Sequence, residues 1–363
     1  MAEAASLSFS QVISDLERVR GLDADGARRV FDTIFAGEWN PMQIAGLLVA
    51  LRVLGETPEI VCAAAAAMRA RMVSVEHGLP LVFDTCGTGG DGQGTVNVST
   101  GAALIVAGAG VPVAKHGNRA ASSRSGSADV LGALGIPLDL APSAQGGLLA
   151  RNNIAFLFAP LHHPAMKYAN PPRRELGVRT IFNVLGPLAN PARATHQLVG
   201  AFSDGVRGLM ARALHELGSR SAWVVHSEDG LDEISPYAST RVSVVTPEGV
   251  QERSVAPEDF GLQRSPSGAL AGGDPEHNAA ILQRILAGEK HPARSALVLN
   301  AAASLAIARG LELRAAAALA ESALSSGAAL KTLENWRELA RAMTPGVTPG
   351  VTAGEAPAAS PSA

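Results

Sequence analysis

The chain has 363 residues, of which 47% are hydrophobic and 17% are charged, and its formal net charge is −3 at pH 7. This much apolar material excludes a chain that is disordered throughout, and the length predicts two domains of ordinary size. The negative charge argues against a nucleic-acid or anionic-membrane surface as the main role. Cys62 and Cys86 are too few for a disulfide framework or a zinc site. Because no stretch resembles a signal peptide or reaches the roughly 18 apolar residues of a membrane span, we expect a cytoplasmic protein.

Residues 8–75 are predicted to be helical throughout. Apolar residues recur every three or four positions from Val12 to Val19 and again from Val30 to Phe35. Asn40–Pro41 and Thr57–Pro58 each pair a capping residue with a proline, which is typical of the start of a helix. The pattern therefore predicts a small helical domain in which no catalytic residues stand out.

From Leu79 the pattern changes to short apolar runs that alternate with helical stretches. The expected strands are Leu81–Phe83, Val111–Ala114, Ile154–Phe158, Leu198–Phe202, Trp223–His226 and Val242–Val245. Alternation of this kind predicts a mostly parallel central sheet flanked by helices on both faces. Toward the C-terminus, Leu297–Ile307 and Leu313–Met343 are expected to be helical. The predicted fold class is α/β, with a small N-terminal helical domain and a large α/β domain.

The expected domain boundaries follow from these patterns. Residues 1–78 form the helical domain, and about 162–185, a basic segment interrupted by prolines, is expected to pack back on it. Residues 79–161 and 186–343 form the α/β domain. From Thr344 the sequence is rich in Pro, Gly, Ala and Ser, so residues 344–363 are predicted to be a disordered tail.

A glycine-rich segment, Asp84–Gly92, lies between the first expected strand and a helix that begins near Asn97–Thr100. Glycines let consecutive backbone N–H groups face an anion, and the helix start adds its positive end and hydroxyl donors. A phosphate or diphosphate is the expected ligand, although a tight turn that needs positive φ explains such a segment about equally well. The segment is not a Walker loop, and its glycine spacing does not fit a dinucleotide fingerprint.

A second polar segment, Lys115–Ser127, directly follows the next expected strand. It should therefore lie at the same carboxyl edge of the sheet, where open α/β folds bind ligands. Its basic, amide and hydroxyl side chains suit an anion-binding loop, and the alternative is a solvated surface loop. Two such segments on consecutive turns favour the binding interpretation.

A third segment, His226–Glu233, carries four acidic residues around an Asp-Gly turn. Carboxylates are the hard oxygen ligands that Mg²⁺ prefers, whereas the alternative is an exposed acidic turn.

A fourth segment contains adjacent histidines, His162 and His163, and further on Arg173. The histidines are better explained as polar residues of a proline-bounded linker than as zinc ligands, because neighbours in sequence cannot both face one ion in the usual spacing. Arg173 could bind a carboxylate through two hydrogen bonds. For Arg173 a structural role and a binding role are about equally plausible from the sequence.

Together, the motifs GTGGD, NVST, KHGNRAASS, HHPAMK, RRELGVRTIFNVLGPLANPA and DGLDE closely resemble the anthranilate phosphoribosyltransferase family. They occur in the family's order, and the match runs from near Leu16 to about Met343. GTGGD and KHGNR-type loops also occur in related phosphorylases, so the combination carries the resemblance. One departure is Arg174, where the family frequently has lysine.

The resemblance implies transfer of the 5-phosphoribosyl group from 5-phosphoribosyl 1-diphosphate (PRPP) to the amine of anthranilate, in L-tryptophan biosynthesis. It implies a magnesium cofactor, with two ions expected, and a homodimer that forms through the helical domain. The implied PRPP contacts are Gly87, Gly90, Asp91, Thr95, Asn97, Val98, Ser99, Thr100, Lys115, His116, Gly117, Asn118, Arg119, Ala120, Ala121, Ser122, Ser123 and Ser127. The implied anthranilate contacts are Gly87, Asn118 and Arg173, and the implied metal ligands are Ser99, Asp232 and Glu233.

No residue is assigned as a general acid or base, because a neutral aromatic amine needs mainly to be positioned. His116 is a candidate for a polar contact with that amine. Two alternative functions fit the sequence less well. A pyrimidine-nucleoside phosphorylase would lack the DGLDE acids, and a non-catalytic nucleic-acid-binding relative would need a basic surface and degraded motifs.

Overall fold

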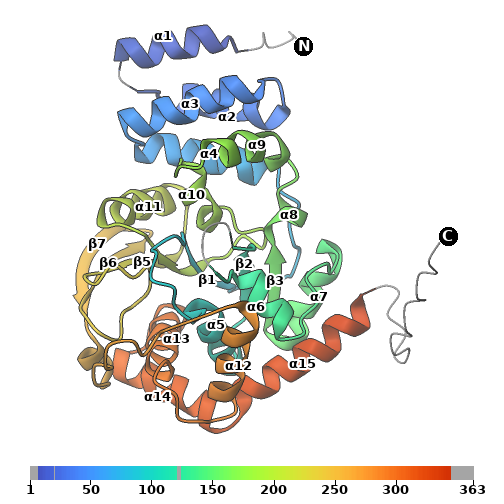
Figure 1. Ribbon diagram of the computed structural model, residues 1–363, viewed down its shortest axis with the longest axis vertical. Coiled ribbons are helices and arrows are strands. Elements are labelled where there is room, and N and C mark those ends of the chain that lie inside the picture. The colour runs from blue at the N-terminus through green and yellow to red at the C-terminus, as the bar shows by residue number, and fades with distance from the viewer. Residues whose placement is uncertain (1–6, 20, 121–123, 345–363) are drawn as a thin grey trace, which may run out of the picture.

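The structure is a computed structural model and describes residues 7–19, 21–120 and 124–344. Four helices begin the chain and stack at one end of the molecule (Figure 1): α1 (Phe9–Val19), α2 (Ala24–Ala36), α3 (Pro41–Leu54) and α4 (Pro58–Ala70). The side chains of Asn40 and Thr57 accept hydrogen bonds from the first turns of α3 and α4. These caps confirm the helix starts predicted at the two Asn-Pro and Thr-Pro pairs.

A seven-stranded sheet in the order β3-β2-β1-β4-β5-β6-β7 lies at the centre of the rest of the chain. The strands are β1 (Phe83–Gly87), β2 (Val113–Gly117), β3 (Ile154–Phe158), β4 (His196–Gly200), β5 (Ser221–Ser227), β6 (Thr240–Thr246) and β7 (Gly249–Val255). The first five pair in parallel, and β6 and β7 are antiparallel additions at one edge. The structure thus confirms the predicted α/β class with a mostly parallel sheet.

β4 is shifted and β5 and β6 are longer than predicted, and three other strands depart further from the prediction. β1 and β2 extend to Gly87 and Gly117, so Asp84–Gly87 and Lys115–Gly117 are strand residues and not loop residues. Because a buried parallel strand normally has a continuous run of apolar residues, these polar side chains led to the prediction of loops. β7 was missed because it is a mostly exposed edge strand without an apolar alternation.

Helices cover both faces of the sheet. They are α5 (Val98–Gly108), α6 (Ser127–Ala133), α7 (Pro142–Asn152), α11 (Asp204–Glu216), α12 (Pro275–Leu286), α13 (Arg294–Arg309), α14 (Leu313–Ser325) and α15 (Ala328–Met343), with a short 3-10 helix, η2 (Pro257–Phe260). Trp223 and Val225 on β5 join the core formed with α5 and α13, whereas Ala222 and Val224 face α11 and a second core. This second core continues into α2–α4. The stretch predicted to be helical to Met343 breaks at Gly327, whose φ is +75°.

The connection after β3 runs along the N-terminal helices (Figure 1) and contains α8 (Ala159–His162), α9 (Met166–Leu176), α10 (Phe182–Leu185) and η1 (Gly186–Leu188). α9 packs against α2 and α3. Gly37, at the end of α2, lies so close to the Tyr168 ring that a Cβ atom there would approach it to 2.5 Å.

The domain boundaries stay a prediction, and residues 345–363 of the predicted tail lie outside the described residues. Within the described ranges, no single helix is long and apolar enough to cross a membrane, although the bent pair α13 and α14 would pass by length and composition alone.

Candidate active site

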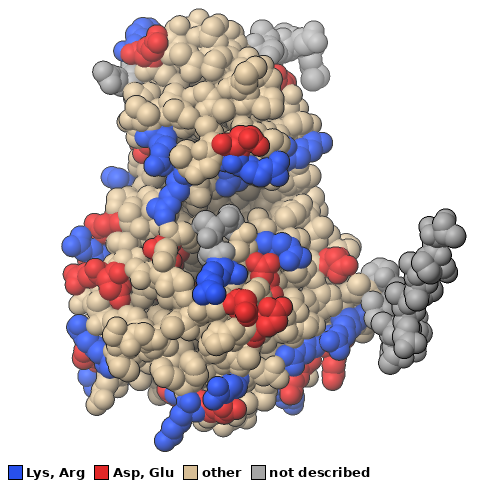
Figure 2. Space-filling model, viewed as in Figure 1, with Lys and Arg blue, Asp and Glu red and all other residues tan. Residues whose placement is uncertain are grey.

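A cavity of about 650 Å³ lies at the carboxyl ends of β1 and β2, facing the segment that contains α8–α10. Ligands of open parallel sheets bind at this edge, because the loops that follow neighbouring strands meet there. Basic side chains gather between the N-terminal helices and the α/β part (Figure 2). Those that line the cavity are Lys115, Arg119, Arg124, Lys167, Arg173 and Arg179. The cavity is therefore suited to an anionic ligand.

All the predicted site residues within the described part of the chain line this one cavity. They are Gly87, Gly90, Asp91, Thr95, Asn97, Val98, Ser99, Thr100, Lys115, His116, Gly117, Asn118, Arg119, Ala120, Ser127, Arg173, Asp232 and Glu233. Ala121, Ser122 and Ser123 lie outside the described residues. Which ligand each residue binds stays a prediction.

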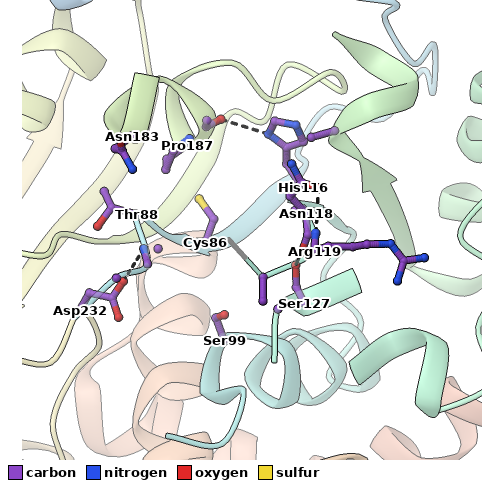
Figure 3. A pocket seen from close by; sticks show the side chains of 18 of the residues that line it. Cys86, Thr88, Ser99, His116, Asn118, Arg119, Ser127, Asn183, Pro187 and Asp232 are labelled. Atoms are coloured by element: carbon purple, nitrogen blue, oxygen red, sulfur yellow. Dashed lines mark hydrogen bonds between the residues drawn. The ribbon is translucent and has the colours of Figure 1, made fainter. Parts of the chain in front are cut away.

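The glycine-rich segment needs glycine for two separate reasons. Gly89 and Gly90 have φ values of +67° and +75°, which favour residues without a Cβ atom. Gly87 has no such φ, but a Cβ atom there would lie 2.6 Å from Asp232 Oδ2. The backbone N–H of Gly89 donates to that same oxygen at 2.8 Å (Figure 3). The close approach of an acidic side chain, and not only the turn, explains these glycines.

Of the four acids, Glu228 and Asp229 are exposed, but Asp232 and Glu233 are not, so the exposed-turn alternative is wrong for these last two. Asp232 is buried, and burial together with the nearby carboxyl of Asp91 raises its pKa to about 7. Glu233 accepts a hydrogen bond from the backbone N–H of Ser99 at 3.1 Å, and burial and Asp232 raise its pKa well above the usual value. Carboxyl groups that crowd one another in this way are stabilised by a cation.

The donor set fits magnesium. The described residues contain no group of three His, Cys, Asp or Glu side chains arranged to hold a metal ion on their own. Magnesium commonly takes one or two carboxylates from the protein and completes its shell with water and substrate phosphates. Asn300 on α13 fixes the backbone directly after the acidic pair. Its Oδ1 accepts from the N–H of Ile234 and its Nδ2 donates to the C=O of Ile234, both at 3.0 Å.

Two ionisable residues of β1 and β2 are buried at the cavity: Lys115 lines it, and Asp84 does not. Lys115 is buried and donates from Nζ to the carbonyl of Thr85 at 2.7 Å and to Ser99 Oγ at 3.2 Å. Asp84 is fully buried and accepts from Asn190 Nδ2 at 2.8 Å and from the backbone N–H of His116 at 3.2 Å. Burial raises the pKa of Asp84 to about 6. Lys115–Gly117, the first part of the second polar segment, therefore belong to a strand and not to a loop.

The segment after β2 is held at both ends by one carboxylate. Asp129 Oδ2 accepts from the backbone N–H groups of Ala120 at 2.9 Å and Gly126 at 3.0 Å, and Oδ1 pairs with Arg119 at 3.1 Å. The sequence offered a signal for this, because an acidic residue in the first turn of a helix commonly caps the preceding backbone.

The two adjacent histidines have different roles. His162 is buried outside the cavity lining, where Nδ1 contacts the carbonyl of Val73 at 2.7 Å, as expected for a linker residue. His163 lines the cavity, and its Nε2 lies 3.2 Å from Nε2 of His116. His116 Nδ1 faces the carbonyl of Gly186 at 3.0 Å, so this nitrogen carries the proton and Nε2 accepts. His163 thus lies in the linker and, beyond the prediction, also lines the cavity.

Arginines of the connection after β3 reach the cavity from its other side. Arg173 on α9 donates to Asn170 Oδ1 at 3.3 Å and lies 5.2 Å from the centre of the Phe182 ring. Arg179, which was not among the predicted site residues, donates to the carbonyl of Gly90 and stacks 4.1 Å from the ring centre of Phe202. The only sequence feature that pointed to Arg179 as a site residue was its position in the motif RRELGVRTIFNVLGPLANPA.

Apolar side chains also line the cavity, and one of them, Phe182, lies beside Arg173. They are Met68, Ala159, Pro160, Met166, Phe182, Leu185 and Pro187. An aromatic ring that carries a carboxylate would find there both a place for the ring and a cation.

Comparison with known proteins assigns the class. Residues 10–72 match the glycosyl transferase family, helical bundle domain, and residues 79–330 match the glycosyl transferase family, a/b domain. The chain belongs to this family of glycosyl transferases. Curated relatives that match nearly the whole chain are anthranilate phosphoribosyltransferases, and this confirms the resemblance.

The protein from Rhodopseudomonas palustris (strain BisA53) is 48% identical over 328 residues, covering 90% of this chain and 96% of that one. The one from Bradyrhizobium diazoefficiens is 49% identical over 328 residues, covering 90% and 97%. Among solved structures, anthranilate phosphoribosyltransferase from Thermus thermophilus superimposes with a TM-score of 0.86 at 44% identity, covering 91% of this chain and 99% of that one. The Saccharomyces cerevisiae enzyme in complex with PRPP and Mg has a TM-score of 0.84 at 29% identity, covering 92% and 99%.

Proposed function

We propose that this chain transfers the 5-phosphoribosyl group of PRPP to the amine of anthranilate, releasing diphosphate, in L-tryptophan biosynthesis. One observation carries the proposal: the glycine-rich segment, the buried acid pair and Arg173 line a single cavity. The first two suit a diphosphate with magnesium, and the third suits the carboxylate of an aromatic acid. The yeast relative has been solved with PRPP and Mg and with 4-fluoroanthranilate.

The residues of the cavity would act mainly by positioning and by electrostatic stabilisation. Breaking the bond to diphosphate builds negative charge on the leaving group and positive, oxocarbenium-like character on the ribose. The backbone N–H groups after β1 and the basic side chains after β2 would stabilise that negative charge. Ser99, Asp232 and Glu233 would hold magnesium, which supplies further positive charge beside the diphosphate. We propose two ions.

The anthranilate amine is a neutral nucleophile, so the protein has mainly to orient it. Arg173 would bind the carboxylate, with Gly87 and Asn118 beside it. Burial and the neighbouring His163 lower the pKa of His116 well below its usual value, which keeps the ring neutral at pH 7. A neutral His116 would offer the amine a polar contact without adding charge.

The decisive test is a fluorescence assay. The protein is mixed with anthranilate, PRPP and Mg²⁺, and we expect anthranilate fluorescence to fall only when all components are present. Phosphorolysis of a pyrimidine nucleoside without turnover of anthranilate would instead favour the phosphorylase function.

We also propose a homodimer that forms through the N-terminal helices. Met42 and Val53 on α3 are 81% and 78% exposed, which is unusual for large apolar side chains. Val53 also lines a shallow groove together with Ile13, Leu16, Glu17, Ala50 and Leu54. Light scattering should give twice the chain mass, and Val53→Glu should shift the protein toward the monomer.

Two further proposals concern domain organisation and compartment. The separate family matches to residues 10–72 and 79–330 support the predicted division at about residue 78. The unpaired Cys62 and Cys86 fit a reducing cytoplasm.

A further inference from the structure

Asn97 begins α5 but does not cap it. Asparagine at this position normally accepts a hydrogen bond from the first turn of the helix, and here no such bond forms. Instead Asn97 Oδ1 accepts from Asn278 Nδ2 at 2.9 Å and from Ser125 Oγ at 3.3 Å, while its Nδ2 donates to the carbonyl of Ser125 at 3.2 Å. The Asn97 amide therefore ties α12 to the segment that precedes α6.

Asn278 lies behind the cavity wall. It is on α12, 181 residues from Asn97 in sequence, and is 1% exposed. Asn97 and Ser125 line the cavity, whereas Asn278 is not among the lining residues. Any effect of Asn278 on a ligand must then pass through the lining residues it contacts, which are Asn97 and Gly273.

The backbone determines which way both amides point. The N–H of Gly273 donates to Asn278 Oδ1 at 2.8 Å. Because an N–H group can only donate, the donor end of Asn278 is left to face Asn97, where it requires the oxygen. The N–H donors of Asn97 then face Ser125. A reversed amide at either residue would place like groups against each other.

The backbone segment that contains Gly273, just before α12, is itself held in place. The N–H of Gly272 donates to the carbonyl of Gly94 at 2.9 Å, and Thr95 pairs with Ala271 in an isolated β-bridge. A Cβ atom on Gly272 would lie 2.5 Å from the backbone of Thr95. The segment before α12 thus stays against the glycine-rich segment.

We propose that Asn278 is a positioning residue for PRPP: it holds the Asn97 amide with its donor end toward Ser125 and the cavity. The inference rests on the proposed function, since it takes PRPP to be the ligand beside Asn97. N–H donors suit phosphate oxygens, whereas an inverted amide would present a carbonyl oxygen to them. Asn278 acts through Asn97 and Gly273, neither of which is a predicted anthranilate contact, so binding of anthranilate should not depend on it.

The test is Asn278→Asp, which preserves shape and inverts one end of the side chain. In the variant, the side chain at position 278 still accepts from the N–H of Gly273, but it presents an oxygen to Asn97 where the wild type presents an N–H donor. The Asn97 amide must then rotate, so that its own oxygen faces Ser125 and the cavity. We expect the KM for PRPP to rise about tenfold or more, the KM for anthranilate to stay within about twofold, and kcat to change little. The PRPP-induced rise in melting temperature should shrink in parallel.

Asn152→Asp is the matched control. Asn152 is a buried asparagine on α7 that donates to the carbonyl of Thr332 at 3.1 Å and does not line the cavity. It should lower stability without separating the two KM values. If Asn278→Asp does not fold, Asn278→Ala removes the donor without inverting it and should give a smaller rise in the same direction.

Three results would overturn the inference: an unchanged KM for PRPP, an equal rise in both KM values, or the same separation in the control. A wild-type protein without turnover would contradict the proposed function instead. The melting shift with PRPP would then still decide whether Asn278 affects ligand binding.

Discussion

The backbone N–H of Ser99 donates to Glu233 Oε1 at 3.1 Å, although 134 residues separate the two in sequence. This bond joins the first turn of α5 to the acidic turn after β5. Because the N–H of Ser99 belongs to the first turn of α5, the bond holds Glu233 beside the start of that helix.

The first prediction concerns the acid pair. Asp232→Ala combined with Glu233→Ala should lower turnover by roughly a hundredfold or more, because the proposed magnesium ligands are lost. The fold should survive, since removal of two crowded carboxyl groups relieves a buried electrostatic cost. Circular dichroism and the fluorescence assay check the two parts together. Glu228→Ala, which changes an exposed acid of the same turn, is the control, and wild-type turnover in the double variant or indifference to EDTA would contradict the metal site.

The second prediction concerns Arg173. If its guanidinium pairs with the anthranilate carboxylate, Arg173→Ala should cost on the order of 2–4 kcal/mol of transition-state binding. The KM for anthranilate should rise strongly and that for PRPP much less, and lysine should rescue only part of the loss. Arg174→Ala, at an exposed neighbouring position, should be nearly silent. Steady-state kinetics against each substrate decides the matter, and equal damage to both KM values would point to a structural arginine.

The third prediction concerns Arg179, which holds the carbonyl of Gly90 from the opposite side of the cavity. Arg179→Met should raise the KM for PRPP by roughly three- to tenfold, the range expected for one lost hydrogen bond. A suitable control is Arg220→Met, because Arg220 also donates to a backbone carbonyl, that of Pro80, outside the cavity lining. A similar effect of both substitutions would show that Arg179 has no special role.

The fourth prediction concerns the pH dependence of stability. Burial raises the pKa of Asp84 to about 6, above its unfolded value of 3.8. Between these values the folded protein keeps a proton that the unfolded chain releases, so this contribution to the free energy of unfolding falls as pH rises from about 4 to 6. The buried His163, whose pKa falls to about 4, acts in the opposite direction over a similar range.

The substitution Asp84→Asn separates the contribution of Asp84 to the free energy of unfolding from that of His163. The variant lacks the acid, so its free energy of unfolding should increase more, or decrease less, between pH 4.5 and pH 7 than that of the wild type. The difference should be about 2 kcal/mol, and urea unfolding at both pH values measures it. Parallel pH profiles of variant and wild type would show that Asp84 does not titrate in this range.

The sequence by itself determined the local features of this protein and much of its site. The starts of α3 and α4 follow from Asn40 and Thr57, because a cap acts on backbone groups only three residues away. The segments after β1 and β2 were assigned to one edge of the sheet because parallel strands place their carboxyl ends together. In each case the determining contacts are close in sequence or follow from the alternation of strands and helices.

Only the tertiary structure decided the rest. The polar Asp84 and Lys115 are strand residues because partners from distant segments satisfy them inside the sheet, which no local pattern reveals. The contact between His116 and His163 and the orientation of Asn97 by Asn278 likewise depend on long-range packing. A side-chain hydrogen bond needs donor and acceptor within about 3 Å. Chain spacing cannot specify such a distance across many residues, and it is the packing of α12 and of the connection after β3 against the sheet that does so.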